Sequence, residues 1–407
     1  MVESNPIIGQ SHDVGSRLGL SVTCGAQNAT GQEHGEKQFF HGEDTAVPLH
    51  RRDRQCRVAP CRHAVRYNFF VLLKIGVLVL GLTGVAAAQE SDWKGPLPVQ
   101  NQRPLQANFL QFAPQSPETL PKGQSRLGFR FDIANNLLIP NPDGAALVQE
   151  DFETQRLTLN YRRGLRNGLE AEVLGSLVAR NGGILDGPIE AYHRLLGLDG
   201  DGEDNPQGRD NISKGRSVFS FDDGNGNRIN RGSDFGLGDT TFSLKKGLSS
   251  GNFTSVARVG VKIPTASSGK LLGSGGVDFG VTLDARYRLA PEWALFVSAG
   301  VLKFGSSDIP NSKSSGLQGG LGFEWRKSAR ESFVAQIDAA TRTVTTENSF
   351  ADGTPVLASV GYKRRVGQDK LFWASFSENG DYHNFNAPFF GNVGPDFTLT
   401  IGYQMGL

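Results

Sequence analysis

From residue 125 to the end, the chain alternates apolar and polar residues in one segment after another. In the last segment, one face holds only apolar residues, namely Phe397, Leu399, Ile401, Tyr403, Met405 and Leu407. The other face holds Thr398, Thr400, Gly402 and Gln404. A side-chain period of two is that of a β-strand whose two faces meet different surroundings. The pattern therefore predicts an all-β chain with one face of each strand in an apolar medium.

The same period divides 125–407 into twelve strands, an even number, as in single-chain bacterial barrels. The predicted strands are 125–133, 153–163, 168–179, 235–247, 252–264, 276–289, 292–304, 316–327, 331–344, 355–366, 369–378 and 396–407. The gaps between them are alternately short and long, and the longest is 180–234. Outer-membrane barrels have short periplasmic turns and long external loops. The sequence thus predicts an antiparallel transmembrane β-barrel of about 12 strands over 125–407, with both ends in the periplasm.

A long apolar run, FFVLLKIGVLVLGLTGVAAA (69–88), precedes this region. Arg66 supplies positive charge before it, and Ala86 and Ala88 form an A-x-A site before Gln89. This layout predicts a secretory signal peptide over 65–88, cleaved near Ala88-Gln89, and hence export to the bacterial outer membrane. An anchoring helix is the alternative, but Lys74 divides the run. Residues 1–64 have no clear period, and we expect a spurious or disordered extension.

Residues 89–124 form a proline-rich segment with six prolines and no period. Because proline donates no backbone hydrogen bond, we expect no central strand here. The sequence predicts either a periplasmic tail or a segment that plugs the barrel.

Composition limits the classes of partner. The formal net charge is +1, so no strongly basic surface points to nucleic acid. After residue 88 there is no phosphate loop, zinc-ligand cluster or dinucleotide motif, and no cofactor is expected. The expected partners are outer-membrane lipid, the barrel-assembly machinery and a small solute.

Three segments carry a resemblance to a known family. They are GPLPVQNQRPL (95–105), GLGDTTFSLKKGL (236–248) and VGVKIPTASSGKLLGSGGVDFGVTL (259–283). The chain resembles DUF3187, an uncharacterised family of bacterial outer-membrane barrels. It is also similar in pattern to barrels associated with aromatic-compound (meta-pathway phenol) degradation. The resemblance implies an outer-membrane location without an assigned activity. The last residue, Leu407, departs from the aromatic residue that usually ends such barrels.

The first candidate site consists of charged residues at the alternate strand positions that we expect to face the barrel lumen. The candidates for a solute path are Arg130, Arg156, Arg258, Lys262, Asp284, Arg286, Arg288 and Glu324. A charged interior can select polar solutes. The same residues can instead pair with one another and brace the wall, because twelve strands lie between filled and open barrels.

The oversized loop 180–234 is the second candidate. Within it, 188–198 is predicted to be a short amphipathic helix that begins at Pro188. Folded inward, this helix would constrict the pore through Tyr192, His193 and Arg194; folded outward, it would cap the rim.

The same loop contains a weak calcium pattern. Asp223, Asn225, Asn227 and Asp234 occupy positions 1, 3, 5 and 12 of an EF-hand-like count. The sixth position holds Arg228 instead of glycine, which favours ordinary loop polarity, so no metal site is predicted.

Catalysis would need a nucleophile, a base and an orienting group within mutual reach. Only His193 and His383 follow residue 88, in different loops, and neither lies in a hydrolase motif. No catalytic residue is assigned. The leading hypothesis is an outer-membrane channel or transporter for a small solute; the alternatives are a closed structural or surface-interaction barrel and an outer-membrane hydrolase.

Overall fold

The structure is a computed structural model. It describes residues 93–138, 148–196, 214–223, 225–266, 268–345, 353–379 and 394–407, all within one compact unit, 66–407. The predicted signal peptide, the extension 1–64 and His383 lie outside these ranges. Within them, no helix has the length and apolar character needed to cross a membrane.

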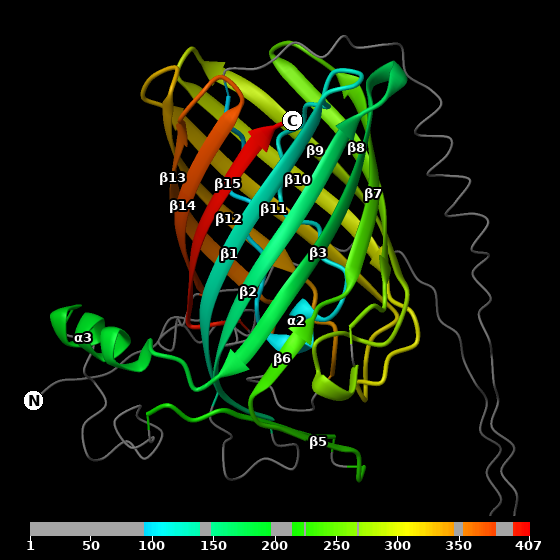
Figure 1. Cartoon of the computed structure of the whole chain (residues 1–407), viewed down its shortest axis with the longest axis vertical. Coiled ribbons are helices and arrows are strands. Elements are labelled where there is room, and N and C mark those ends of the chain that lie inside the picture. The colour runs from blue at the N-terminus through cyan, green and yellow to red at the C-terminus, as the bar shows by residue number, and fades with distance from the viewer. Residues whose placement is uncertain are drawn as a thin grey trace, which may run out of the picture. The chain divides into compact units, whose positions relative to one another are not determined.

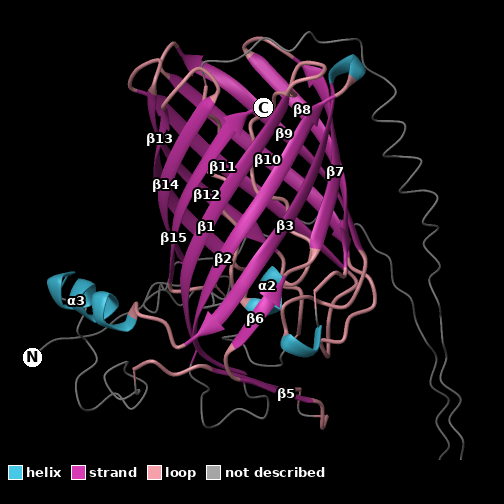
Figure 2. Ribbon diagram, in the orientation of Figure 1, coloured by secondary structure: helices cyan, strands magenta, loops and turns pink. Residues whose placement is uncertain are grey.

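Twelve antiparallel strands form a closed barrel (Figures 1 and 2). β1 (Ser125–Leu138) pairs with β2 (Val148–Gly164) on one side and with β15 (Phe397–Gly406) on the other, which closes the ring. The remaining strands of the ring are β3 (Leu169–Asn181), β7 (Thr240–Ser249), β8 (Phe253–Ile263), β9 (Asp278–Ala290), β10 (Trp293–Lys303), β11 (Ser315–Arg326), β12 (Glu331–Ala340), β13 (Val356–Arg365) and β14 (Lys370–Asn379). The predicted fold class is confirmed.

The two ends of the barrel differ, as the alternating gaps predict. At one end, which we call the short-turn end, brief connections join β2 to β3, β7 to β8, β9 to β10, β11 to β12 and β13 to β14. The opposite end, the long-loop end, carries the other connections and is the lower end in Figure 1. In the part of the chain that the structure describes, 3₁₀ turns lie at Arg166–Gly168, at the short-turn end, and at Ser268–Lys270, at the long-loop end.

Three short strands and a helix occupy the predicted loop 180–234 and its border. α3 (Asp186–Leu196) includes most of the predicted helix. β4 (Val218–Asp222) pairs with the start of β2 and with β5 (Arg228–Arg231). β6 (Asp234–Leu237) pairs with the end of β3. The predicted strand 235–247 is therefore broken between β6 and β7, where the Gly238 N–H donates to the Ser176 carbonyl at 2.8 Å.

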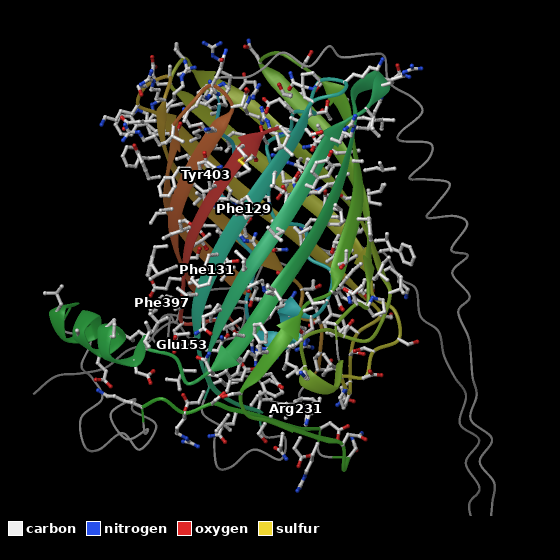
Figure 3. The ribbon with its side chains drawn as sticks, viewed as in Figure 1. Phe129, Phe131, Glu153, Arg231, Phe397 and Tyr403 are labelled. Carbon is white, nitrogen blue, oxygen red and sulfur yellow. The ribbon has the colours of Figure 1, made fainter. Side chains whose placement is uncertain are left out.

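The outer face of the barrel is apolar. On β15, Leu399 and Ile401 are 41% and 57% exposed, whereas Thr400 between them is 1% exposed. Figure 3 shows Phe129, Phe131, Phe397 and Tyr403 along this outer surface. Because a charge facing lipid is costly, such a face is typical of a membrane-spanning strand. The fold is thus that of an outer-membrane β-barrel.

An aromatic band surrounds part of the barrel at the short-turn end. The rings of Trp293 and Trp325 stack 6.2 Å apart, and Phe333 lies 5.7 Å beyond Trp325. Tyr362 continues the row 5.3 Å from Phe333. These residues face one another across adjacent strands in the ladder. Rows of this kind mark the level of the lipid headgroups.

The proline-rich segment lies inside the ring of strands. We call residues 93–124 the luminal segment; in Figure 1 its cyan trace runs between the strands, and its one helical turn, α2 (Pro104–Ala107), lies toward the long-loop end. Apolar residues of this segment, such as Leu97, Phe109 and Leu110, are at most 2% exposed. The core of the molecule is therefore built around the luminal segment.

Candidate functional site

The luminal segment crosses the lumen twice. At the short-turn end, the Arg326 guanidinium lies over the Trp93 ring, 4.9 Å from its centroid. At the long-loop end, Thr343 donates to the Leu105 carbonyl. The chain then returns, and the Leu120 N–H donates to Glu170 at 2.8 Å, close to the turn that joins β2 to β3. Both limbs of residues 93–124 therefore contact the inner face of the barrel wall.

Two glutamine side chains of the barrel wall hydrogen-bond to the backbone of this segment, as the backbone of a neighbouring strand would. The Gln336 amide accepts from the Leu97 N–H at 2.7 Å and donates to the Leu97 carbonyl at 3.0 Å. Gln318 does the same for Phe112, at 3.0 and 2.9 Å. A buried backbone group without a partner costs about 1–3 kcal/mol. These amides therefore let an irregular, proline-rich backbone lie in the barrel interior.

Charged wall residues also hold the backbone of the luminal segment. Glu324 accepts from the N–H groups of Lys94 and Gly95, each at 2.9 Å, and from the Ser332 hydroxyl at 2.6 Å. The Lys363 ammonium donates to the carbonyls of Lys94, Gly95 and Pro96, at 3.0, 3.0 and 2.6 Å. Both side chains are almost fully buried. Glu324 and Lys363 thus fix the first limb of the segment near the short-turn end.

Ion pairs connect the segment to the wall at several heights. Arg103 pairs with Glu150 at 2.8 Å, and Glu118 pairs with Arg286. The Arg258 guanidinium lies 4.8 Å from the centroid of the Phe112 ring and donates to the Ala113 carbonyl at 3.0 Å. Removing one partner from such a buried pair costs more than the pair itself contributes, because the other charge is left uncompensated. Each contact therefore favours the occupied lumen.

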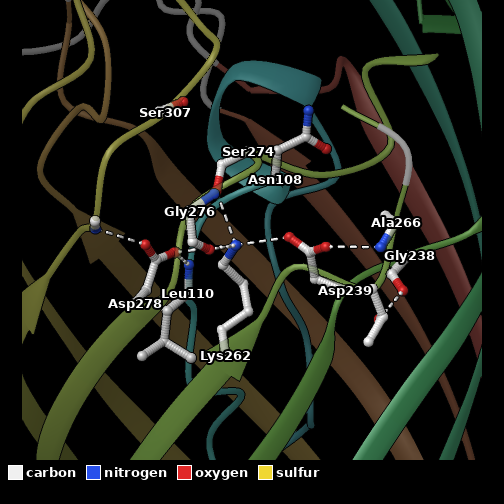
Figure 4. Close-up of polar contacts among 12 residues, drawn as sticks. Asn108, Leu110, Gly238, Asp239, Lys262, Ala266, Ser274, Gly276, Asp278 and Ser307 are labelled. Atoms are coloured by element: carbon white, nitrogen blue, oxygen red, sulfur yellow. Dashed lines mark hydrogen bonds and ion pairs between the residues drawn. The ribbon is translucent and has the colours of Figure 1, made fainter. Parts of the chain in front are cut away.

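Lys262 is the centre of a polar network in the long-loop half (Figure 4). Its ammonium donates to Asp239 at 2.6 Å, to the Ser274 hydroxyl at 2.8 Å and to the Gly276 carbonyl at 3.1 Å. Asp278 lies 3.3 Å from the same ammonium and accepts from the Leu110 N–H at 2.9 Å. All three donors of the ammonium are engaged, so this lysine braces the interior in the conformation described.

Seven of the eight predicted solute-path residues lie in the interior and contact the luminal segment or the wall. They are Arg130, Arg156, Arg258, Lys262, Asp284, Arg286 and Glu324. Arg288 differs: it is exposed at the short-turn end, where its N–H donates to the Asn252 carbonyl. The predicted orientation toward the lumen is thus correct for seven residues, while their contact with a solute stays a prediction.

An apolar cluster closes the interior at the long-loop end. Phe109 of the luminal segment lies edge-on to Phe304, with 5.1 Å between ring centroids. Phe219 and Phe221 of β4 belong to the same cluster, as does Phe152 of β2. β4, which lies within the predicted loop 180–234, therefore packs into the apolar cluster at this end of the barrel.

Paired glycines make room for the aromatic ring of Phe112. Gly260 and Gly280 face each other on β8 and β9. A Cβ atom at either position would lie 2.7 or 2.5 Å from the Phe112 ring. No larger residue fits there without displacing the ring, so these two positions help to define the seat of the luminal segment.

The predicted loop constriction at Tyr192, His193 and Arg194 stays untested, because these side chains lie outside the part that the structure describes. In Figure 1 the helix that carries them, α3, projects to the side of the barrel's end. Ile184, before the helix, and Leu195, within it, are 79% and 82% exposed, whereas Ile189 of the same helix is 2% exposed.

Three of the weak calcium candidates, Asp223, Asn225 and Asn227, form an ordinary turn, and Asp234 begins β6. Asp223 accepts from the side chain of Asn227 at 2.6 Å and from the N–H groups of Asn225 and Asn227 at 2.9 and 3.0 Å. These hydrogen bonds, that of the Asn227 side chain foremost, hold the pKa of Asp223 below its ordinary value. Within the described ranges, no three histidine, cysteine, aspartate or glutamate residues come together as metal ligands. The contacts of Asp223 are sufficient to explain its place in the turn.

Open space remains beside the luminal segment. A cavity of about 190 Å³ lies toward the short-turn end, and one of about 70 Å³ lies further into the barrel. Arg162, Lys363 and Trp373 line the larger one. Lys363 and Trp373 were not candidates at the level of sequence, although both stand on the inward period of their strands, which was the signal that could have found them.

These features define a transmembrane β-barrel whose lumen is occupied by its own N-terminal segment. The model of a family described as a protein of unknown function (DUF3187) matches residues 73–407. The chain belongs to this family, and the resemblance to DUF3187 seen in the sequence is confirmed. No curated protein matches the chain.

Several solved structures share the barrel architecture. The COG4313 outer membrane channel from Pseudomonas putida F1 is 14% identical, with a TM-score of 0.48 over 73% of this chain and 100% of that chain. The KdgM porin is 6% identical, with a TM-score of 0.35 over 69% of this chain and 98% of that chain. The Ralstonia pickettii toluene transporter TbuX is 9% identical, with a TM-score of 0.33 over 80% of this chain and 98% of that chain. At these values the likeness concerns the fold alone.

Proposed function

We propose that this protein is an outer-membrane channel for a small solute and that the structure is its closed conformation. The observation that carries the proposal is the luminal segment, which crosses the lumen twice and is held by individual side chains of the wall. A barrel of twelve strands is wider than one that its own side chains fill. An added segment that occupies the remaining width is the arrangement expected of a pore that opens on demand.

The closed conformation has a defined barrier. The apolar cluster around Phe109 and Phe304 closes the long-loop end, which we assign to the cell exterior. Open space lies mainly toward the short-turn end, which we assign to the periplasm. A solute that entered from outside would first need the cluster to part, with Phe219 and Phe221 of β4 moving away from the luminal segment. The charged residues of the interior would then line its way.

A permanently closed structural barrel is the second candidate, and a specific observation favours it. The interior contains many buried ion pairs and hydrogen bonds, including the fully engaged Lys262. Such a network can serve to stiffen the wall alone. In either case we expect lipid to surround the apolar face, and the barrel-assembly machinery to insert the chain. The hydrolase alternative gains no support, since the His193 and His383 side chains lie outside the described residues.

Ionic current through planar bilayers separates the two candidates. We expect the whole protein to show rare openings. A variant whose residues 96–118 are replaced by a short glycine-serine linker should show steady current, because the segment no longer occupies the lumen. The altered gel mobility of folded barrels before and after heating reports whether this variant folds.

A second variant covers the case in which the deletion prevents folding. Phe109→Ala leaves the backbone intact and weakens only the cluster at the long-loop end, so openings should become more frequent. Replacing α3 alone, over 186–196, should leave the current unchanged if β4 forms the external barrier. Silence of the folded wild type, of Phe109→Ala and of the linker variant would defeat the channel and support the structural barrel.

A further inference from the structure

The larger cavity is built like a binding site. It has a volume of about 190 Å³ and lies between the two limbs of the luminal segment and the inner faces of β1, β2, β14 and β15. Its lining includes Gln368 and Asp369, which are exposed in the turn between β13 and β14, and Lys370, which is exposed at the start of β14, so it opens at the short-turn end. Cavities of about 150 Å³ are large enough to admit benzene. A small organic molecule therefore fits this space.

Three hydrogen-bonding groups that line this cavity have no partner among the residues that the structure describes. They are the Arg162 Nε, the Trp373 Nε1 and the Thr158 Oγ1. Trp373 and Thr158 are 6% and 3% exposed. A buried polar group that lacks a partner is costly, and its persistence at a cavity wall indicates a ligand or solvent that completes it. Two of the three groups are N–H donors that cannot accept, so the missing partner is an acceptor.

The position of the indole is fixed by the wall. Trp373 faces Gly402 across the ladder between β14 and β15. A Cβ at Gly402 would lie 2.0 Å from the Trp373 ring, so the ring rests directly on the glycine backbone. Arg162 is held from two sides, by Gln404, which accepts from its Nη2, and by Glu170, which lies 3.8 Å from its Nη1. Its Nε–H is left for another acceptor.

Charge and shape then define the ligand class. Seven lining residues are lysine or arginine and three are aspartate or glutamate, so the cavity carries an excess of positive charge. The luminal segment contributes Pro96, Pro98 and Pro114 to the lining, and the wall contributes Leu371 beside Trp373. The prolines and Leu371 suit an apolar group, and the flat face of the Trp373 indole suits a planar ring. Arginine, in turn, is suited to binding carboxylates.

We propose that this cavity binds a small aromatic carboxylate. The carboxylate accepts hydrogen bonds from the Arg162 Nε–H and the Trp373 Nε1–H, and the ring lies among the prolines of the luminal segment. This inference rests on the proposed function, because it names the class of solute that such a channel would take. Since the luminal segment forms part of the site, binding there is also coupled to the position of that segment.

Benzoate binding to the detergent-solubilised protein tests the proposal by titration calorimetry. We expect saturable binding of benzoate and at least about tenfold weaker binding of benzyl alcohol, which has the ring without the charge; a tenfold change corresponds to about 1.4 kcal/mol. Sulfate, which has the charge without the ring, should also bind at least about tenfold more weakly. Equal binding of either comparison compound would overturn the assigned ligand class.

Variants locate the site. Arg162→Gln and Trp373→Phe should each weaken benzoate binding, by about tenfold for the arginine and by less for the tryptophan. Arg163→Gln is the matched control, because Arg163 is the next residue on β2, is exposed and does not line the cavity. Unchanged affinity in Arg162→Gln, with the barrel still folded, would place benzoate elsewhere and overturn the proposal.

The site and the channel can fail separately. Benzoate binding by a barrel that remains silent in bilayers keeps the site and defeats transport. Openings of the intact protein in bilayers, together with no benzoate binding by it at millimolar concentration, keep the channel and defeat the site.

Discussion

Both halves of the barrel interior hold the luminal segment by hydrogen bonds, but the apolar packing around the segment is more extensive in the long-loop half. In the long-loop half, the luminal segment packs through Leu105, Phe109 and Phe112 against apolar residues of the wall and loops. In the short-turn half, Glu324 and Lys363 hold the same segment by hydrogen bonds to its backbone. The first half is closed by apolar packing, while the second keeps a cavity with unpartnered donors.

This difference indicates which half resists opening and which half recognises a ligand. Apolar packing is not directional, so the cluster around Phe109 and Phe304 can separate and close again, once the Arg103–Glu150 pair at the same end has also parted. Hydrogen bonds in the short-turn half are directional and leave the Arg162 and Trp373 donors in a defined place. We therefore expect substitutions at the long-loop end to change stability and opening most, and substitutions around the cavity to change binding most.

The largest expected effect is that of Phe304→Ala. Phe304 is 3% exposed and contacts Phe109, so its removal leaves a cavity in the closure. The free energy of unfolding should fall by about 3–5 kcal/mol, measured by urea titration of the detergent-solubilised barrel. Phe323→Ala is the matched control, because Phe323 is 42% exposed on the outer face. Equal losses in both variants would contradict a closure built on apolar packing.

A somewhat smaller effect is expected for Glu324→Leu. The substitution leaves the N–H groups of Lys94 and Gly95 without their acceptor, at about 1–3 kcal/mol for the unpaired groups. Amide hydrogen exchange at these two residues should become faster while exchange in the strands stays slow. Glu292→Leu, in an exposed turn, should leave exchange unchanged. Slow exchange at Lys94 and Gly95 in the Glu324 variant would show that something else anchors the first limb.

The smallest effect lies outside the barrel, in the turn between β4 and β5. Hydrogen bonds from Asn227 and Asn225 lower the pKa of Asp223 in the folded chain. A lowered folded pKa stabilises the turn at pH values above the unfolded pKa of about 3.9. That stabilisation is lost as the pH falls through the folded value. Amide exchange at Asn225 and Asn227 should thus accelerate in acid in the wild type, whereas Asp223→Asn should show little further acceleration.

Much of the barrel could be predicted from the sequence, because lipid and lumen impose opposite demands on alternate residues. Twelve predicted segments coincide with the twelve strands of the ring, and seven of eight predicted lumen residues lie inside. The exception, Arg288, lies so close to the short-turn end that the inward period no longer implies burial. The two-residue period predicts which way a side chain points, but it does not predict how far along the strand the buried part of the lumen extends.

Other parts could not be predicted, since their contacts join residues far apart in the chain. Leu97 depends on Gln336 and Phe112 on Gln318, and no local pattern relates these residues. The short strands β4 and β6 extend the ladders of β2 and β3 beyond the apolar band, where the alternation that marks a membrane strand is no longer required. Lys363 and Trp373 occupy strand positions that alternate toward the lumen, yet only the course of the luminal segment shows which groups they contact there.

A reversible tether between the luminal segment and the wall tests most directly whether this segment controls the pore. The three cysteines of the chain all precede residue 62, so Leu97→Cys with Gln336→Cys introduces one reactive pair into the barrel. We would bridge the pair with a short reducible bis-thiosulfonate linker and record single-channel current in planar bilayers. The bridged protein should stay silent, and openings should return on reduction. Steady current of equal size before and after reduction would contradict a lumen controlled by residues 93–124.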